Sequence, residues 1–202
     1  MRKFWCGVVS REHIKRGVAG GFCQVCHGKS APLNRMSVGD GIVFYSPTHK
    51  FKGKERCQKF TAIGQVIGKG SYQFKMAPDF IPYRRDIEYI SGHEVAIHPM
   101  LDQLEFTTGE TNWRFKFRFG HFEISQSDFV TIGQHMVGSV TLSECFNLSD
   151  STISTIPLHP YDLTLQQIRK YPFPGQRYLA FETISNVLCL TCCWVALLII
   201  CA

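Results

Sequence analysis

Three short apolar runs constrain what this chain can fold into. They span residues 3–9, 42–45 and 60–67, and they are rich in aromatic and β-branched residues. Runs of this length and composition are typical of buried strands. A Gly-Asp turn signal precedes the second run, as expected where a loop leads into a strand. The runs therefore predict a sheet built from several short strands.

Short helices are expected between and after these strands. Ser10 is a suitable capping residue for a helix over residues 11–16, and Ser125 for a helix over residues 126–136. The segment over residues 95–104 should also turn helical after Pro99. Together, these elements predict an α+β fold with a mainly antiparallel, barrel-like sheet, and the sequence contains no internal repeat.

Further strands are expected from alternating patterns. Residues 113–124 alternate with period 2, which predicts a strand with an aromatic face and a basic face. The two faces would carry Trp113, Phe115, Phe117 and Phe119 on one side, and Arg114, Lys116 and Arg118 on the other. Residues 72–75 should pair with the strand over 60–67, and residues 87–90 should form another strand. Pro47 is expected to end the second strand.

The stretch over residues 20–29 predicts a ligand-facing loop. It reads G-G-F-C-Q-V-C-H-G-K, and its glycines permit backbone geometry that side chains forbid. Phe22 is suited to stacking and Gln24 to hydrogen bonding. His27 and Lys29 are suited to contacts with anions or polar edges.

The same loop contains a C-x-x-C-H pattern. Cys23, Cys26 and His27 match the motif of c-type haem attachment, and the two thiols could also form a redox pair. Haem attachment normally occurs outside the cytosol, yet the basic start of the chain is not followed by the apolar run of a secretory signal. A structural zinc site would need four ligands, usually in two close pairs. Two reduced thiols on a loop are the simpler interpretation, and a haem or redox protein is the alternative function.

The positive charge of the chain is concentrated in its first two thirds. The net charge is +6, and residues 137–202 contribute three Lys/Arg against four Asp/Glu. A basic region with many aromatics is compatible with nucleic acid, because phosphates attract the charge and bases stack on the rings. A solvated basic surface without a partner would look the same. Nine cysteines without a secretory signal predict a reducing compartment, the cytoplasm, or the nucleus in a eukaryote.

The C-terminal third differs from the rest of the chain in composition and in hydrophobic patterning. Residues 137–186 are dense in Ser and Thr and are broken by prolines, which predicts an irregular or disordered extension. Residues 187–202 are uncharged and mostly apolar, but shorter than the ~20 residues of a comfortable membrane span. This segment could be a tail anchor that contacts a membrane, an element that covers apolar surface, or a segment under no functional demand. The interpretation without membrane contact is preferred.

Residues 1–136 form the predicted domain, and residues 3–136 resemble an EVE domain of the PUA-like superfamily, as in UPF0310-type proteins. The matching pieces are K-F-W-C-G-V-V-S-R-E-H at 3–13, G-V-A-G-G-F-C-Q-V-C-H-G-K at 17–29, A-P-L-N-R-M-S-V-G-D-G-I-V-F-Y-S-P at 31–47, F-T-A-I-G-Q-V at 60–66, P-Y-R-R-D at 82–86, L-E-F at 104–106 and W-R-F-K-F-R-F-G at 113–120. The resemblance implies a PUA-like pseudobarrel that is not an enzyme. It also implies a pocket for a modified base in DNA or RNA, much as the similar YTH domains hold theirs. The family loop reads G-F-x-Q-x-x-H-G-K, so both cysteines fall at variable positions.

Twelve residues are candidates for this base-binding site, and no cofactor is expected. Trp5, Phe22, Tyr45 and Trp113 could stack on a base; Ser10, Gln24, His27 and Ser46 could read base edges; Lys29, Arg84, Arg85 and Arg118 could hold phosphates. Each has a structural alternative. The tryptophans could belong to the core, His27 could tie down its loop, and either arginine could pair with a carboxylate such as Asp86.

Overall fold

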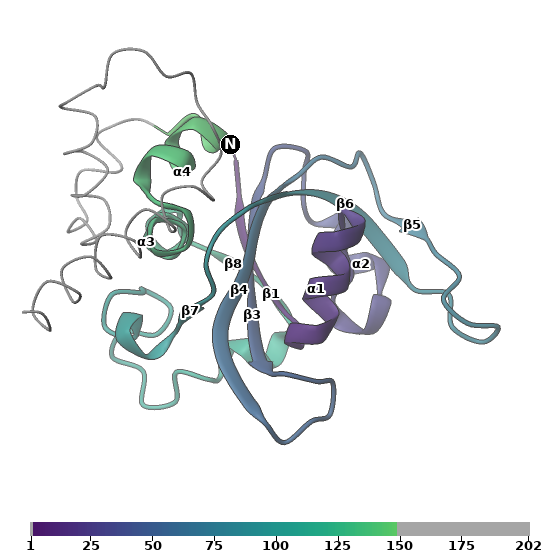
Figure 1. The fold of residues 1–202 in the computed structure, drawn as a ribbon, viewed down its shortest axis with the longest axis horizontal. Coiled ribbons are helices and arrows are strands. Elements are labelled where there is room, and N and C mark those ends of the chain that lie inside the picture. Colours follow the sequence, from purple (N-terminus) through teal and green to yellow (C-terminus); the bar gives the residue numbers. More distant parts are fainter. Residues whose placement is uncertain (1, 149–202) are drawn as a thin grey trace, which may run out of the picture. The chain divides into compact units, whose positions relative to one another are not determined.

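A curled sheet of mainly antiparallel strands organises residues 2–148, the part of the chain that the computed structural model describes (Figure 1). The strands lie in the order β2-β6-β4-β3-β1-β8, with β5 beside β6 and β7 beside β4. They span Phe4–Val8 (β1), Phe22–Cys23 (β2), Gly41–Thr48 (β3), Arg56–Val66 (β4), Tyr72–Gln73 (β5), Tyr83–Ile90 (β6), Val95–Ala96 (β7) and His121–Ile124 (β8). Only the β1–β3 pair among these is parallel. The α+β, PUA-like prediction is confirmed.

Helices cover both faces of this sheet, with α1 and α2 on one side and α3 and α4 on the other (Figure 1). The α-helices span Arg11–Gly20 (α1), Ser30–Asn34 (α2), Gln126–Val137 (α3) and Ser139–Phe146 (α4); short 3₁₀ helices span Cys26–Gly28 (η1), His98–Met100 (η2) and Lys116–Phe119 (η3). Each pair of helices encloses its own apolar core against the sheet.

Strand β3 is buried on both faces, which explains its continuous apolar sequence. Ile42 and Phe44 point to the core beneath α1 and α2, whereas Val43 and Tyr45 point to the core beneath α3. Successive side chains of a strand alternate between faces, so a central strand covered on both sides needs apolar residues at every position.

The ends of two helices follow from local sequence. Ser125 caps α3 as expected, because its hydroxyl accepts a hydrogen bond from the Asp128 amide at 3.1 Å. Helix α1 starts after Ser10 as expected, although the Ser10 side chain makes no capping hydrogen bond. It continues past Gly17 and ends at Gly21, which adopts the left-handed conformation (φ 66°) common at helix C-termini.

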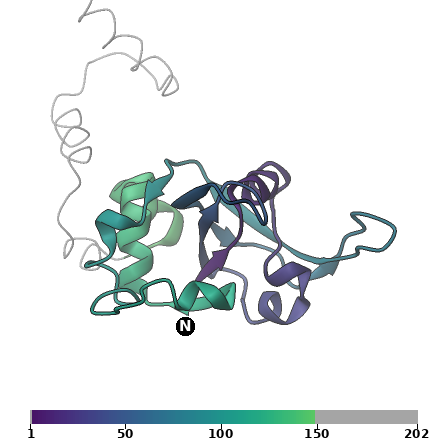
Figure 2. The same ribbon diagram turned by 90° about the horizontal axis from the view of Figure 1, so that it is seen from below.

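Two strand expectations were wrong. Strand β3 passes through Pro47 instead of ending there, because its register with β4 shifts between Ser46 and Thr48. A proline fits such an irregularity, where its missing amide is not needed. Strand β5 pairs with β6 through Tyr72 and Gln73 and not with β4. It forms a hairpin that projects from the sheet in both ribbon views (Figures 1 and 2).

The long strand expected over residues 113–124 is mostly absent. Residues 113–119 form turns and the 3₁₀ helix η3, and only His121–Ile124 pair as β8. Gly120 separates the two parts with a left-handed φ of 73°. The aromatic residues therefore do not share one face, since Phe117 is buried while Phe119 is exposed. The helix expected over 95–104 is likewise reduced to η2 and turns.

Helix α4 lies within the stretch that was expected to be irregular. Its Leu142 and Phe146 are buried, and Phe146 meets Phe129 of α3 at 4.9 Å between ring centroids. The remaining parts of the two predicted C-terminal segments, from residue 149 to 202, lie outside the described residues. Within residues 2–148, every helix is too short or too polar to cross a bilayer.

Candidate nucleic-acid interface

The C-terminal ends of β1 and β3 meet at one edge of the sheet. Val8 lies opposite Tyr45, and the Val9 amide donates a hydrogen bond to the Tyr45 carbonyl at 3.1 Å. Strand β8 runs antiparallel to β1 with His121 opposite Gly7, so the segment that precedes β8 reaches the same edge. The loop between β3 and β4 also lies there, at the lower end of Figure 1.

Two contacts connect the loop before α2 with this edge. The Cys26 thiol lies 3.6 Å from the Phe119 carbonyl oxygen, and the His27 ring meets the Phe51 ring edge-on with 5.6 Å between centroids. Three segments of the chain, distant in sequence, are therefore neighbours. We call them together the strand-end surface: residues 26–29, 49–56 and 113–120.

The strand-end surface exposes aromatic rings. Phe51, Phe119 and Phe115 are 63%, 60% and 49% exposed. Phe115 and Phe119 meet edge-to-face at 5.6 Å between centroids. Exposed aromatics gathered in one place commonly mark an interaction site, and each ring can stack on a nucleobase.

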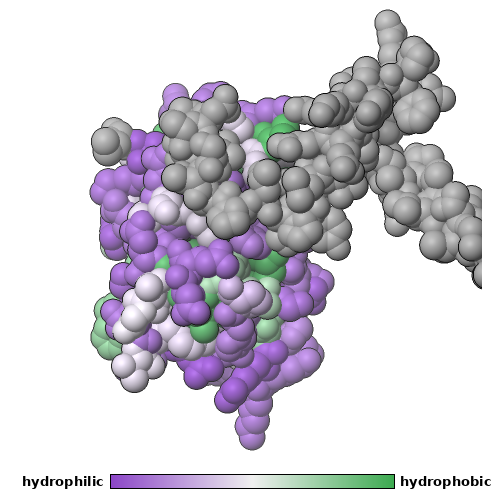
Figure 3. All heavy atoms as spheres, turned by 90° about the vertical axis from the view of Figure 1, so that its left-hand side faces the viewer, coloured by the Kyte–Doolittle hydropathy of each residue, from purple (hydrophilic) through white to green (hydrophobic). Residues whose placement is uncertain are grey.

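The same surface is strongly basic. Its only carboxylate is Glu55, which lies 3.8 Å from the His49 imidazole. Its Lys and Arg residues are Lys29, Lys50, Lys52, Lys54, Arg56, Arg114, Lys116 and Arg118. In the space-filling view, the lower end of the molecule, where the β3–β4 loop lies, is hydrophilic (Figure 3). A cluster of one sign of charge attracts anions and speeds their association.

The turn that presents His27 has unusual backbone geometry. Cys26, His27 and Gly28 all have positive φ, at 50°, 58° and 78°. Left-handed conformations are costly for residues with a Cβ, and they persist where surrounding contacts hold them. Gly28 packs so closely on Pro82 that a Cβ on Gly28 would lie 2.2 Å from the Pro82 Cβ. This packing holds the His27 side chain out at the surface.

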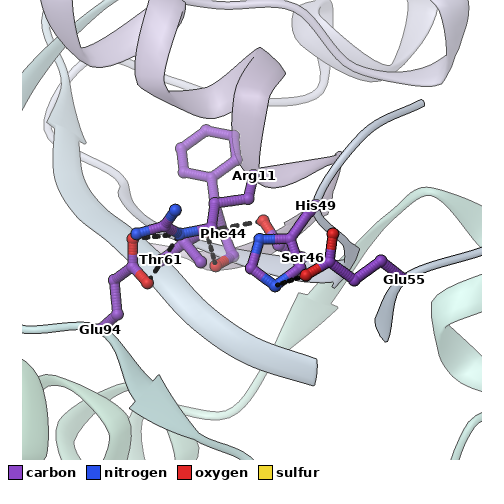
Figure 4. Close-up of polar contacts among 7 residues, drawn as sticks. All are labelled: Arg11, Phe44, Ser46, His49, Glu55, Thr61 and Glu94. Atoms are coloured by element: carbon purple, nitrogen blue, oxygen red, sulfur yellow. Dashed lines mark hydrogen bonds and ion pairs between the residues drawn. The ribbon is translucent and has the colours of Figure 1, made fainter. Parts of the chain in front are cut away.

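Polar contacts near this surface include one that joins the start of α1 to the residue before β7 (Figure 4). Arg11 Nε lies 2.7 and 2.9 Å from the two carboxylate oxygens of Glu94. The hydroxyls of Ser46 and Thr61 share a hydrogen bond of 2.8 Å, and Thr61 also donates to the Phe44 carbonyl at 3.3 Å. Ser46, a candidate reader of base edges, is thus buried and already bonded.

Trp5 belongs to the core and stacks on His121. The two rings are 4.8 Å apart and nearly parallel, and they are 1% and 3% exposed. The Trp5 indole donates a hydrogen bond to an Asp40 carboxylate oxygen at 2.9 Å. Both ring nitrogens of His121 lack a hydrogen-bond partner within residues 2–148. Burial, aided by the charge of Arg35, lowers the pKa of His121 to about 4.

This buried imidazole predicts a pH-dependent stability. Between pH 6.5 and pH 4, the unfolded chain binds a proton at His121 that the folded chain does not, so the free energy of unfolding should fall as the pH falls. At about 1.4 kcal/mol per pKa unit, the loss at pH 4 is roughly 3 kcal/mol. Burial also lowers the pKa of His13, which adds in the same direction.

Urea unfolding between pH 7 and pH 4.5 tests this prediction. His121→Phe keeps a ring against Trp5 and should remove most of the slope. His93→Phe changes an exposed histidine and should leave the slope intact. An unchanged slope in His121→Phe would show that His121 is not the group that titrates.

Three candidates, Phe22, Gln24 and Arg84, meet in a second cluster at the base of the β5–β6 hairpin. Arg84 Nε donates to the Gln24 side-chain oxygen at 3.3 Å, and the Arg84 guanidinium lies 3.7 Å from the Phe22 ring centroid. Lys29, His27 and Arg118 instead lie on the strand-end surface and are exposed.

The adjacent arginine, Arg85, has a structural role. Its guanidinium donates to the carbonyls of Leu33, Met36 and Gly68 at 2.7 to 3.1 Å, and the residue is buried. Asp86 accepts a hydrogen bond from Tyr72 at 2.8 Å and does not pair with either arginine. Arg85 therefore holds α2 and the loop after β4 against β6.

The remaining candidates lie at the strand ends, largely beneath the surface. Tyr45 is buried and stacks on Phe117 at 4.0 Å, and burial raises its pKa to about 12. Trp113 is half-buried and meets Phe117 edge-on at 6.1 Å. Ser10 is buried at the start of α1, and its hydroxyl does not cap that helix.

The thiols of the C-x-x-C-H motif do not have the properties of a redox pair. Burial raises the pKa of Cys23 to about 12, and burial also raises the pKa of the half-buried Cys26. A reactive cysteine needs a lowered pKa and access to solvent. The haem or redox alternative therefore gains no support from this geometry.

Sequence reasoning missed several residues that the fold brings to or near the interface. Phe51 is not among the candidate residues, and the alternating pattern placed Phe115 and Phe119 only on the aromatic face of a predicted strand. His121 carried no signal at all, because only the pairing of β8 with β1 brings it to Trp5. The exposure of Phe51 and Phe119 depends on turns whose shape the local sequence does not specify.

Comparisons with known proteins are consistent across most of the described residues. The EVE domain family model matches residues 3–135. UPF0310 protein YdcG of Bacillus subtilis (strain 168) is 47% identical over 133 residues, covering 66% of this chain and 91% of YdcG. UPF0310 protein msl3206 of Mesorhizobium japonicum is 49% identical over 146 residues, covering 71% of this chain and 98% of msl3206.

The solved structures that align with this chain are more distant in sequence. A hypothetical protein from Leishmania major aligns with a TM-score of 0.44 and 14% identity, over 65% of this chain and 92% of that protein. The MmI1 YTH domain aligns with a TM-score of 0.40 and 7% identity, over 70% of this chain and 96% of that domain. The assignment therefore rests on the family model and the close relatives: this chain belongs to the EVE domain family.

Proposed function

We propose that this protein is a non-enzymatic nucleic-acid-binding module that reads a modified base in DNA or RNA. The observation that carries the proposal is the strand-end surface, where exposed phenylalanines stand among eight Lys and Arg residues and one carboxylate. Basic side chains hold phosphates, and aromatic rings stack on bases, so this combination suits a single strand.

The proposed mechanism divides the work among three kinds of side chain. Lys29, Arg118 and their basic neighbours hold the backbone phosphates, which sets affinity but carries no sequence information. Phe51 and Phe119 stack on bases, which contributes about 1–3 kcal/mol per base. His27, held outward by its left-handed turn, and the Ser10 hydroxyl, which does not cap α1, are suited to hydrogen bonds with a base edge.

The modified base is the finer part of the proposal. A base swung out of its strand costs a few kcal/mol of unstacking, which contacts in the site must offset. A modification then adds either an apolar contact or a hydrogen bond. The family resemblance implies such recognition, and the mixture of rings and polar groups on this surface is compatible with it.

A binding titration of the full chain tests the proposal. The ligands are single-stranded DNA and RNA, each with and without methylated or hydroxymethylated bases, at two salt concentrations. We expect tighter binding to one modified strand and weaker binding at higher salt, since each phosphate contact contributes roughly −0.7 to the slope of log K against log salt.

Two surface variants sharpen the test. Phe119→Ala should weaken binding about 5- to 150-fold, which corresponds to the loss of one stacked base. Val38→Ala removes an equally exposed apolar side chain before β3, at the opposite end of that strand, and should leave binding unchanged. Binding that is equally tight in Phe119→Ala, or indifferent to salt, would contradict the proposal.

A further inference from the structure

The hairpin of β5 and β6 projects from the sheet and exposes apolar side chains. Its arms are joined by hydrogen bonds from the Phe74 amide to the Pro82 carbonyl at 2.9 Å and from the Met76 amide to the Phe80 carbonyl at 3.0 Å. Both ribbon views show it standing away from the helices (Figures 1 and 2). Its exposed large apolar residues are Tyr72, Phe74, Met76, Phe80 and Ile81, and Ile67, in the loop before β5, is exposed as well. Such a patch marks an interaction surface.

At the base of this hairpin, an arginine is held between two aromatic rings. The Arg84 guanidinium carbon lies 3.7 Å from the Phe22 ring centroid and 3.6 Å from the Phe74 ring centroid. These short distances on both sides define a stack of ring, guanidinium and ring. We call Phe22, Arg84 and Phe74 the arginine stack.

Arg84 has no carboxylate partner in the described part of the chain. Its Nε donates to Gln24, but within residues 2–148 its terminal nitrogens make no hydrogen bond, and no carboxylate lies within ion-pair distance. The residue is 8% exposed, so this guanidinium is both rigid and poorly hydrated. A fixed planar guanidinium matches the geometry of a phosphate and can donate two parallel hydrogen bonds to it.

Phe74 leaves ring surface available beyond the arginine. It is 44% exposed although Arg84 covers one side, and no other ring packs on it in the described part of the chain. A nucleobase can therefore extend the stack on Phe74 while a neighbouring phosphate meets Arg84. Stacking of this kind requires an unpaired base.

A polyanion suits this patch better than an apolar protein partner. The Arg84 charge is already buried without a carboxylate partner among the described residues, so an anion placed on it would compensate the charge, whereas an uncharged surface would not. Lys75 at the hairpin and Lys69 in the loop before β5 add positive charge, whereas Asp79, Asp86 and Glu88 add negative charge, and Asp86 accepts a hydrogen bond from Tyr72. The hairpin also adjoins the strand-end surface, because Gly28 of the His27 turn packs on Pro82.

We propose that the arginine stack is a second nucleotide-binding site, which holds a nucleotide of the same single strand beside the one on the strand-end surface. This inference rests on the proposed function and extends its footprint along the strand. It makes binding dependent on strand length and specific for single strands. A ligand too short to reach from one site to the other would use only one of them.

The test measures binding of the full chain to three ligands: a dinucleotide, a ten-nucleotide single strand and a ten-base-pair duplex. The ligands carry the modified base preferred in the first titration, or no modification if none is preferred. Wild type should bind the ten-nucleotide strand at least about tenfold more tightly than either other ligand. Phe74→Ala should weaken binding of the long strand at least about fivefold, the smallest effect expected for one stacked base. It should weaken dinucleotide binding by a smaller factor, because a dinucleotide engages one site at a time and can still use the strand-end surface.

Further variants separate stacking from packing and from folding. Phe74→Leu keeps an apolar side chain without a ring and should weaken binding as Phe74→Ala does. Val18→Ala, on α1 and similarly exposed, should have no effect. The inference is overturned if Phe119→Ala weakens binding while both Phe74 variants bind normally, or if Phe74→Leu restores wild-type affinity. Absence of binding to every strand by wild type would overturn the proposed function itself.

Discussion

Replacing Trp5 by alanine is expected to destabilise the fold by about 3–5 kcal/mol, the usual cost of removing a large buried aromatic side chain. The indole is fully enclosed, stacks on His121 and donates to Asp40. Small domains have total stabilities of about 5–15 kcal/mol, so this one change removes a large share. Chemical denaturation monitored by circular dichroism measures the loss. A loss of nucleic-acid binding in Trp5→Ala would consequently report unfolding.

Two variants calibrate the Trp5 prediction. Trp5→Phe keeps a ring but removes the indole donor, and should cost about 1–3 kcal/mol because a buried hydrogen bond is lost. Phe115→Ala removes an exposed ring and should change stability by less than about 0.5 kcal/mol. If Trp5→Ala lowered the free energy of unfolding as little as Phe115→Ala does, Trp5 would not be buried between the sheet and α2.

Gly28→Ala is expected to cost about 2–5 kcal/mol, from a left-handed backbone penalty of about 1–2 kcal/mol and overpacking of about 1–3 kcal/mol. Gly28 has a φ of 78°, and an added Cβ would lie 2.2 Å from the Pro82 Cβ and 2.9 Å from its Cα. The backbone would have to move, and the His27 turn would move with it. Urea denaturation measures the loss of stability.

The matched control is Gly109→Ala. Gly109 has a similar φ of 72°, but no atom lies within 4 Å of its added Cβ. It should show only the backbone penalty of about 1–2 kcal/mol. Equal losses in the two variants would mean that the contact between Gly28 and Pro82 does not support the loop.

Local sequence predicted the strands and helices whose pattern of apolar and polar residues matches their burial in the fold. The runs at 3–9, 42–45 and 60–67 form β1, β3 and β4, because their apolar residues face cores on the two sides of the sheet. Ser125 caps α3, since a cap depends on contacts within a few residues. The α+β class follows from these elements together.

Local sequence failed where a distant segment decided the structure. Residues 113–119 alternate like a strand, yet Phe117 alone is buried, against Tyr45, Phe106 and Phe122. Period 2 describes a strand only if a partner strand is available, and β1 pairs with β8 over only four residues. The predicted partner of β5 was also wrong. The sequence pattern of β5 does not specify its partner strand, which is β6, after it in the chain, and not β4, before it.

The candidate residues also fall into two groups, those predicted correctly from residue type and those whose role depends on tertiary contacts. His27, Lys29 and Arg118 were chosen from residue type and are exposed on the strand-end surface. Trp5 and Arg85 have the same residue types as binding groups, but an indole bonded to Asp40 and a guanidinium bonded to three carbonyls are structural. Residue type indicates what a side chain can do, and its neighbours decide whether that capacity is already used.

The sequence by itself determined the family, the α+β class, the central strands and the basic, aromatic character of the chain. These properties depend on composition, on periodicity and on motifs within short windows. Only the tertiary structure decided that the parallel pairing of β1 with β3 gathers three loops at one edge, and that Arg84 lies between Phe22 and Phe74. Such contacts join residues separated by 10 to 93 positions. They arise when segments pack to bury apolar surface, which no short window of sequence contains.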